Sequence, residues 1–323
     1  MRILISGGSG FLGQRLAARL LRRGTLAGSD GQPQPIAQLT LVDTVPLLPL
    51  EDLRVLVVTG DISDAGVLRT VVGPDTDVVF HLAAVVSGMA EAEFDLGMRI
   101  NVDATRLLFE ACREAGHRPR VVFASSVAVY GGALPAMVDD GTALNPQTSY
   151  GTQKAIGELL LADYTRKGFL DGRALRLPTI TVRPGRPNAA ASSFASGIIR
   201  EPLSGQEAVC PVAPEARIWV LSPSTVIECL IAGAELAPEA FGASRSVNLP
   251  GLSVSAGEMV ESLARVAGPE AAGRVRWEPD ARIARMVAGW PGAWNTSRAE
   301  SMGFPADRSF DQIVQAHLRD QAR

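Results

Sequence analysis

The chain has little of the residue types that mark several classes of protein. Its 323 residues include three cysteines and three histidines, none of them at the close spacing of a metal site. We therefore expect Cys112, Cys210 and Cys229 to be reduced, buried residues of a cytoplasmic protein that holds no metal. The net charge of −3 gives no reason to expect nucleic acid or an anionic membrane as a partner.

Long apolar runs are also missing. No uninterrupted stretch approaches the ~20 residues of a membrane span. The first residues lead straight into a predicted strand, which argues against a signal peptide. The hydrophobic content of 46% is nevertheless enough for a large core. These features favour a soluble enzyme with one large domain and a smaller second one.

A glycine-rich segment follows the first predicted strand, at residues 2–6. It reads Gly7-Gly-Ser-Gly10-Phe-Leu-Gly13, and leucines then recur at helical spacing as far as Gly24. A dinucleotide site needs this order, because glycines let the backbone approach a pyrophosphate and the helix start offers free N–H groups. An ordinary flexible turn is the alternative. We predict cofactor contacts from Gly7, Gly10, Phe11, Leu12 and Gly13.

Strand-like runs alternate with helical stretches along the rest of the chain. Strands are predicted at residues 38–43, 53–58, 78–84, 120–126 and 174–182, a helix over about 94–116, and a surface loop over 28–35. The alternation predicts an α/β fold with a Rossmann-type, doubly wound parallel sheet. The dinucleotide-binding domain would take residues 1–182 and a returning strand near 245–250. A smaller, interleaved C-terminal substrate-binding domain would take residues 183–240 and 251–323.

Two acidic residues lie where predicted strands end, at the edge where such sheets bind ligands. Asp43 ends the second strand, where a carboxylate accepts hydrogen bonds from the adenosine ribose and repels a 2′-phosphate. No arginine or lysine follows it directly, so we expect NAD rather than NADP as the cofactor. Asp61 and Ile62 follow the third strand and would border the adenine, although Asp61 could instead cap the next helix.

Tyr150 and Lys154 are four residues apart in a predicted helix, which places the ammonium near the phenol on one face. A phenol ionises near pH ~10, and a nearby positive charge favours the phenolate. Tyr150 is therefore a candidate proton acceptor. The same spacing occurs on many solvated helices, so the pair gains its meaning from the other motifs.

Together these motifs resemble those of the extended short-chain dehydrogenase/reductase family. The resemblance covers essentially the whole chain and rests on Gly7-x-x-Gly10-x-x-Gly13, Gly60-Asp-Ile62, His81-Leu-Ala-Ala84, Asn101, Ser125-Ser126…Tyr130-Gly131 and Tyr150-x-x-x-Lys154. It implies a catalytic group of Ser126, Tyr150, Lys154 and Asn101. Asn101 would hold a water behind the lysine, or would simply be a buried helix residue bonded to backbone. Further implied cofactor contacts are Leu82, Ala83, Ala84, Ser125, Pro178 and Ile180.

Hydride transfer from a carbinol carbon needs a base, a donor to the reacting oxygen and a placed nicotinamide. Tyr150 would be the base, and Lys154 would lower its pKa and bond the nicotinamide ribose. Ser126 would orient the oxygen, or would only cap the strand end. Relatives that dehydrate sugars carry an Asp-Glu pair where this chain has Val127 and Ala128, which argues against dehydration. The replacement of a later acid by Ser222-Pro223 argues against a nucleotide-sugar substrate.

The segment 175–203 is similar to a narrower subgroup of the family, as are residues 81–88 and 146–158. That resemblance implies oxidation of the 2-hydroxyl of a four-carbon sugar acid, D-erythronate, to the 2-oxo acid. A small acid needs a cation and hydroxyl partners in a compact site. The candidates are Ser87, Ser126, Tyr150, Thr179, Arg183, Asn188 and Ser192. Arg183 is the first choice for the carboxylate, with Arg186 nearby. A salt bridge for Arg183 and a helix cap for Ser192 are the alternatives.

Other functions of the same fold stay open. A nucleotide-sugar 4-epimerase would keep its NAD tightly held, and a cofactor-sensing regulator would bind NAD without catalysis. Such regulators typically lack the Tyr/Lys pair, which this chain keeps. The helices near 95–115 and 150–167 resemble those that pair two subunits in the family, so we expect a homodimer.

Overall fold

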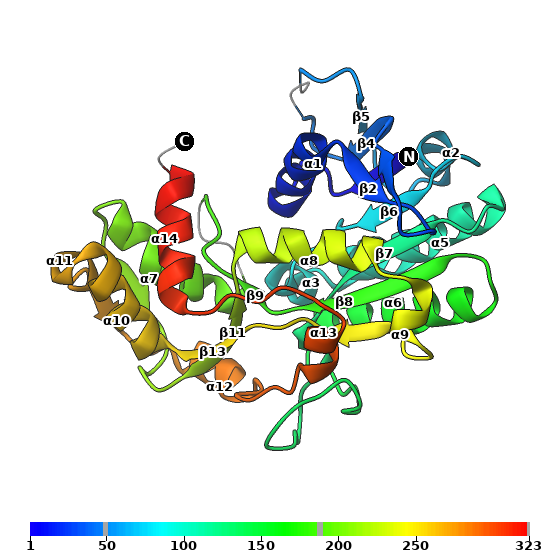
Figure 1. The fold of residues 1–323 in the computed structure, drawn as a ribbon. Coiled ribbons are helices and arrows are strands. Elements are labelled where there is room, and N and C mark those ends of the chain that lie inside the picture. The colour runs from blue at the N-terminus through cyan, green and yellow to red at the C-terminus, as the bar shows by residue number, and fades with distance from the viewer. Residues whose placement is uncertain (48–50, 186–189, 322–323) are drawn as a thin grey trace.

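A parallel sheet of seven strands forms the centre of the molecule, in the order β12-β8-β7-β6-β1-β4-β5 (Figure 1). The computed structural model describes residues 1–47, 51–185 and 190–321. The strands of this sheet are β1 (Arg2–Ser6), β4 (Gln38–Asp43), β5 (Val55–Thr59), β6 (Val78–His81), β7 (Arg120–Ser126), β8 (Asp171–Leu177) and β12 (Ser246–Asn248). All neighbouring strands pair in parallel, which confirms the predicted Rossmann-type fold.

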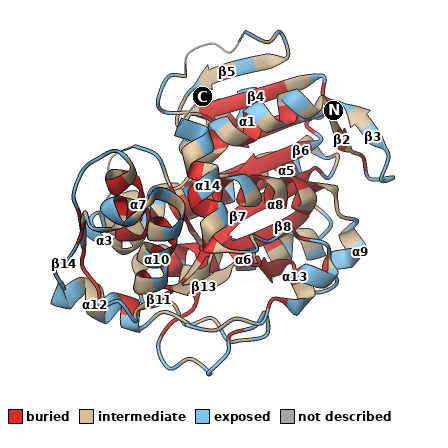
Figure 2. Ribbon diagram, turned by 60° about the vertical axis from the view of Figure 1, so that its left-hand side comes forward, coloured by how far each residue is buried: buried red, intermediate tan, exposed pale blue. Residues whose placement is uncertain are grey.

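Helices cover both faces of the sheet, because alternate residues of each buried strand point to opposite sides. Ile3 and Ile5 of β1 join a core with α1 (Phe11–Arg23) and α8 (Pro223–Glu235). Leu4 points the other way and packs with α2 (Ala65–Val71), α5 (Ala104–Ala115) and α6 (Ser149–Arg166). Figure 2 shows the resulting buried layer of strands between partly exposed helices.

A smaller unit lies beside the large sheet (Figure 1). It contains a sheet of β9 (Thr179–Ile180), β11 (Arg217–Leu221) and β13 (Leu252–Ser255), and a pair of β10 (Ala208–Cys210) and β14 (Val275–Trp277). Its own hydrophobic core includes side chains of α7 (Phe194–Leu203), α10 (Ala256–Ala267), α11 (Pro269–Ala272), α12 (Ala281–Ala288) and α14 (Phe310–Gln321). A capping box of Ser255 and Glu258 starts α10.

Short elements complete the chain. They are β2 (Thr25–Ala27), β3 (Pro33–Pro35), α3 (Ser87–Ala92), α4 (Phe94–Gly97), a π-helix (Met98–Asp103), two 3₁₀ turns (Val127–Val129 and Ala191–Ser193), α9 (Pro238–Phe241) and α13 (Ser297–Ser301). In the described part of the chain, no helix has the length and apolarity to cross a membrane.

Some predicted bounds are wrong, and proline explains the largest difference. The strand predicted over 174–182 is two strands, because β8 ends at Leu177 and β9 follows Pro178 in the second sheet. Proline has no N–H to donate to a ladder. β5 begins at Val55 rather than 53, β6 ends at His81 rather than 84, and the predicted loop 28–35 contains β3. The helix predicted over 94–116 is interrupted by the π-helix.

The chain passes between the two units more than once. The second sheet already includes Thr179, and Ala299 and Phe304 near the C-terminus pack into the core around β1. The two units are therefore interleaved along the chain. The domain boundary predicted between residues 182 and 183 stays a prediction.

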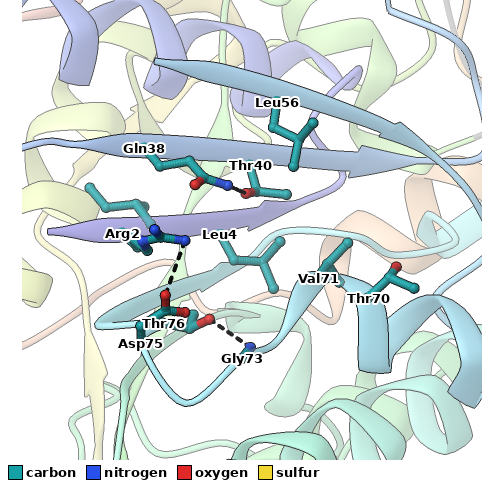
Figure 3. A pocket seen from close by; sticks show the side chains of 11 residues that line it. Arg2, Leu4, Gln38, Thr40, Leu56, Thr70, Val71, Gly73, Asp75 and Thr76 are labelled. Carbon is teal, nitrogen blue, oxygen red and sulfur yellow. Dashed lines mark hydrogen bonds and ion pairs between the residues drawn. The ribbon is translucent and has the colours of Figure 1, made fainter.

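A cavity of about 100 Å³ lies at the amino ends of β1 and β4 (Figure 3). Several of its polar side chains already bond one another, as Arg2 does with Asp75 at 3.0 Å and Gln38 with Thr40 at 3.1 Å. Ligands of such sheets bind at the opposite, carboxyl ends of the strands. The candidate site is therefore sought there.

Candidate active site

The glycine loop joins the end of β1 to the start of α1, with Phe11 and Leu12 in the first turn of that helix. Gly7 has a φ of +76°, and a Cβ there would lie 2.8 Å from the backbone nitrogen of Ala83. A Cβ on Gly13 would lie 2.2 Å from the carbonyl oxygen of Gly7. Both positions therefore require glycine. The compact loop leaves a helix start that suits a pyrophosphate, and its residues fit a dinucleotide.

Asp43 lies beside this loop at the end of β4. Its Oδ2 accepts a hydrogen bond from the N–H of Ser9 at 3.0 Å, and its Oδ1 accepts one from Val45 at 3.2 Å. These bonds fix a partly exposed carboxylate next to the glycine loop. This is the position from which an acid meets the adenosine ribose.

The turn after β5 is organised by Asp61. Its Oδ1 accepts the N–H of Ser63 at 2.8 Å, and its Oδ2 pairs with Arg99 at 2.8 Å. The residue that caps α2 is Asp64, so the helix-cap alternative for Asp61 is wrong. Ile62 is buried next to it, and a contact of these two residues with adenine stays a prediction.

Tyr150 lies in the first turn of α6, which Thr148 caps by accepting the N–H of Gly151 at 3.1 Å. Lys154 Nζ lies 5.7 Å from the centre of the Tyr150 ring and 4.7 Å from that of Phe123. The two residues thus share a helix face, as their spacing predicts. Within the described ranges Lys154 Nζ has no hydrogen bond or ion pair, so its N–H donors are available to a cofactor ribose.

Burial dominates the ionisation of both residues. It raises the pKa of Tyr150 to about 12, while Ser126 and the charge of Arg183 act in the opposite direction. Burial lowers the pKa of Lys154 to about 8, and the charge of Glu158 opposes that change. Arg183 is thus a further cation that favours the Tyr150 phenolate, and the part of Lys154 in lowering that pKa stays a prediction.

Ser126 ends β7 and accepts the N–H of Ala128 at 3.1 Å, so the capping role considered from sequence is present. The same hydroxyl is close enough to lower the pKa of Tyr150. A hydroxyl that accepts one bond still has its own proton to donate. The capping bond and the orientation of a reacting oxygen are therefore compatible.

The segment after Pro178 supplies most of the predicted substrate residues. Thr179 starts β9, and the backbone of Arg183 is held by Ser196 Oγ at 3.0 Å and Arg200 Nη1 at 2.7 Å. The Arg183 guanidinium forms no ion pair with any residue that the structure describes, so the salt-bridge alternative lacks a partner there. Ser87 begins α3 and Ser192 lies in the turn before α7. Asn188 and Arg186 lie outside the described residues.

Asn101 is buried in the π-helix. Its side chain accepts the N–H of Val85 at 2.8 Å and donates to the Val85 carbonyl at 3.0 Å and to Gln153 Oε1 at 2.7 Å. The amide therefore ties the loop after β6 to α6, in agreement with the buried alternative. Its role toward a water behind Lys154 stays a prediction.

The sequence did not single out two features that support these groups. Ser125, predicted to contact cofactor, donates its hydroxyl to Glu158 at 2.5 Å, and Glu158 pairs with Arg176 at 2.7 Å. Gly151 lies so close to the turn after β7 that a Cβ would be 2.1 Å from the carbonyl oxygen of Ala128. A glycine in the first turn of a helix is a weak signal of such a contact.

A doubly wound sheet that carries this constellation at its carboxyl edge defines a nicotinamide-dependent oxidoreductase. Residues 3–219 match the model of the NAD dependent epimerase/dehydratase family, and the chain belongs to this family.

Two relatives match along almost their full length. A D-erythronate dehydrogenase of Cupriavidus necator is 63% identical over 320 residues, 99% of this chain and 98% of the relative. Another D-erythronate dehydrogenase, from Haemophilus influenzae, is 43% identical over 98% of this chain and 99% of its own. Among solved structures, that of a nucleoside-diphosphate-sugar epimerase from Agrobacterium tumefaciens superposes with a TM-score of 0.93 at 47% identity. The match covers 100% of this chain and 94% of the other.

Proposed function

We propose that the protein is an NAD-dependent dehydrogenase that oxidises the 2-hydroxyl of D-erythronate to 2-oxo-erythronate. The observation that carries this proposal is the 63% identity, over 99% of the chain, to a D-erythronate dehydrogenase. The geometry supports it through Arg183, a half-buried cation that acts on Tyr150 and has no ion-pair partner in the described ranges. A small carboxylic acid supplies the missing negative charge.

The residues of the site divide the reaction between them. A bound nicotinamide would supply the acceptor for the hydride that leaves the carbon carrying the hydroxyl. Tyr150 takes the hydroxyl proton, and Ser126 donates a hydrogen bond to the oxygen from which that proton leaves. Arg183 binds the carboxylate, with Ser87, Thr179, Asn188 and Ser192 as hydroxyl or amide partners. Lys154 holds the nicotinamide ribose.

NAD is preferred to NADP in this proposal because of Asp43. Its carboxylate is fixed beside the glycine loop by Ser9 and Val45, so a 2′-phosphate would be brought against a negative charge. The ratio of kcat/KM for NAD and NADP measures the preference.

A homodimer is also proposed, through the outer faces of α5 and α6. These helices pack side by side on one face of the sheet, and Leu159 of α6 is 68% exposed on the outside. An exposed leucine on a long helix suits contact with a second copy. Sedimentation of the purified protein at micromolar concentration tests the assembly state.

The test of the reaction is NADH formation with D-erythronate, L-threonate and UDP-sugars as separate substrates. We expect NADH from D-erythronate, and its absence from every sugar acid would refute the proposal. Interconversion of a UDP-sugar without net NADH would support the second candidate, a 4-epimerase. The likeness to the Agrobacterium nucleoside-diphosphate-sugar epimerase is the observation that favours this second candidate.

Tyr150→Phe provides the matched variant for the base. It removes the hydroxyl and little else, so we expect NAD binding to persist while turnover falls by about 10²- to 10⁴-fold. Cofactor binding is measured by protein fluorescence and turnover by NADH absorbance. Full activity of the variant would exclude Tyr150 as the base.

A further inference from the structure

Glu158 is a buried carboxylate that the reaction as described does not use. It lies on α6 one turn after Lys154 and is 3% exposed. Residues four apart on a helix lie on the same face. The catalytic lysine and this carboxylate therefore face the same side of the helix, toward the sheet.

Hydrogen bonds satisfy Glu158 from two strands of that sheet. Ser125 of β7 donates its hydroxyl to Oε1 at 2.5 Å. Arg176 of β8 donates to Oε1 from Nε at 2.9 Å and to Oε2 from Nη2 at 2.7 Å. Arg176 is 5% exposed and also bonds the Tyr130 hydroxyl and, at 3.4 Å, Asn248 Oδ1 of β12. The carboxylate is thus held in one orientation.

Both partners of Glu158 lie within two residues of part of the candidate active site. Ser125 precedes Ser126, and Arg176 lies two residues before Pro178. Tyr130, whose hydroxyl bonds Arg176, directly follows the 3₁₀ turn that begins after Ser126. Movement of the carboxylate would therefore be transmitted to the Ser126 hydroxyl and to Lys154.

Lys154 has one negatively charged neighbour among the groups that act on it. The groups that contact its ammonium or act on it electrostatically from its own helix and from β6 and β7 are Tyr150, Glu158, His81 and Phe123. Burial lowers the pKa of His81 to about 3, so its imidazole is neutral at pH 7. Lys154 itself is 2% exposed, and burial disfavours its charged form.

We propose that Glu158, oriented by Ser125 and Arg176, is the positioning residue that keeps Lys154 charged and in place beneath the cofactor. This inference rests on the proposed function in assigning Lys154 to the cofactor. Arg176 donates to both oxygens of Glu158, and this pairing offsets the cost of burying a carboxylate. The Glu158 carboxylate thus stabilises the charge of Lys154 without a direct hydrogen bond to it.

The composition of the chain allows a direct measurement. The sequence contains 31 lysines and arginines, of which only Lys154 and Lys167 are lysines. Protein labelled with isotopes in lysine alone gives two side-chain signals by nuclear magnetic resonance. Lys167 is exposed at the end of α6 and serves as the internal reference.

The experiment is a pH titration of Lys154 in the cofactor-free protein, as wild type and as Glu158→Gln. We expect the midpoint of Lys154 to move down by about one pH unit in the variant. The matched control is Asp163→Asn, which removes the same charge from an exposed position on the same helix and should leave the midpoint in place. An unchanged midpoint in folded Glu158→Gln would overturn the proposal and leave Glu158 a structural residue.

A second variant covers the case in which Glu158→Gln does not fold, since it leaves Arg176 buried and unpaired. Glu158→Gln combined with Arg176→Met removes both charges. Its Lys154 midpoint should still move down, by less than in the single variant, and no movement would again overturn the proposal. The titration needs neither substrate nor turnover, so failure to form NADH from D-erythronate would refute the proposed function and leave this result standing.

Discussion

The contact between Gly151 and Ala128 predicts that one methyl group would disable the site. Gly151 follows Tyr150, and Ala128 lies two residues after Ser126. A Cβ at residue 151 would be 2.1 Å from the carbonyl oxygen of Ala128, short of an ordinary 3.4 Å contact by 1.3 Å. The neighbouring atoms are backbone on one side and Pro146 on the other. Gly151→Ala must therefore move α6 away from the turn after β7.

The size of that movement sets the expected loss. A displacement of about 1 Å between reacting groups lowers turnover by about 10²-fold, and overpacking of this kind costs about 1–3 kcal/mol of stability. The better helix propensity of alanine returns up to about 1 kcal/mol. We expect Gly151→Ala to fold with reduced stability and to lose about 10²-fold in kcat.

Steady-state NADH formation and urea unfolding measure the two effects. Gly197→Ala in α7 is the matched control, because its nearest non-neighbouring atoms are the Glu201 carboxylate oxygens at 3.6 Å, an ordinary contact. That variant should gain up to about 1 kcal/mol and keep its turnover. Wild-type kcat in Gly151→Ala would show that the close approach does not set the distance between Tyr150 and Ser126.

Two further predictions concern single side chains. Burial lowers the pKa of His81 from 6.5 to about 3, so the unfolded chain binds the extra proton between these values. The unfolding free energy should then fall as the pH drops below 6.5, by up to about 1.4 kcal/mol per pH unit from this residue. In His81→Asn this part of the pH dependence should be absent, and urea unfolding at a series of pH values measures it. Arg183→Gln should raise the KM for D-erythronate by about 10- to 100-fold with a smaller change in kcat, since a charge-assisted hydrogen bond is lost. An unchanged KM would show that Arg183 does not bind the carboxylate of the substrate.

Local patterns in the sequence predicted much of the fold and part of the candidate site. The glycine loop and the Tyr150–Lys154 pair depend on spacing within one loop and one helix, and both appear in the structure where spacing places them. The parallel sheet followed from the alternation of apolar runs and helical periods, because the inner strands are buried on both faces.

Contacts between distant segments could not be predicted in this way. Arg176 reaches Glu158 because β8 pairs with β7 and α6 packs against both, a relation that no single segment contains. The charge that acts on Tyr150 comes from Arg183, beyond a proline that turns the chain into another sheet. The hydrogen bonds of Asn101 in the π-helix likewise join the loop after β6 to α6, two segments far apart in the sequence.

The break at Pro178 has a consequence for how this molecule could acquire a new specificity. Every cofactor residue predicted from the sequence, apart from Pro178 and Ile180, comes before it, and four of the predicted acid-binding residues follow within a short stretch of chain. Most predicted cofactor contacts thus lie before Pro178, and most predicted acid-binding residues lie after it. Replacement of the stretch that begins at Thr179 by that of a related enzyme would be expected to alter which acid is accepted. The residues before Pro178, which include most predicted cofactor contacts, would not need to change.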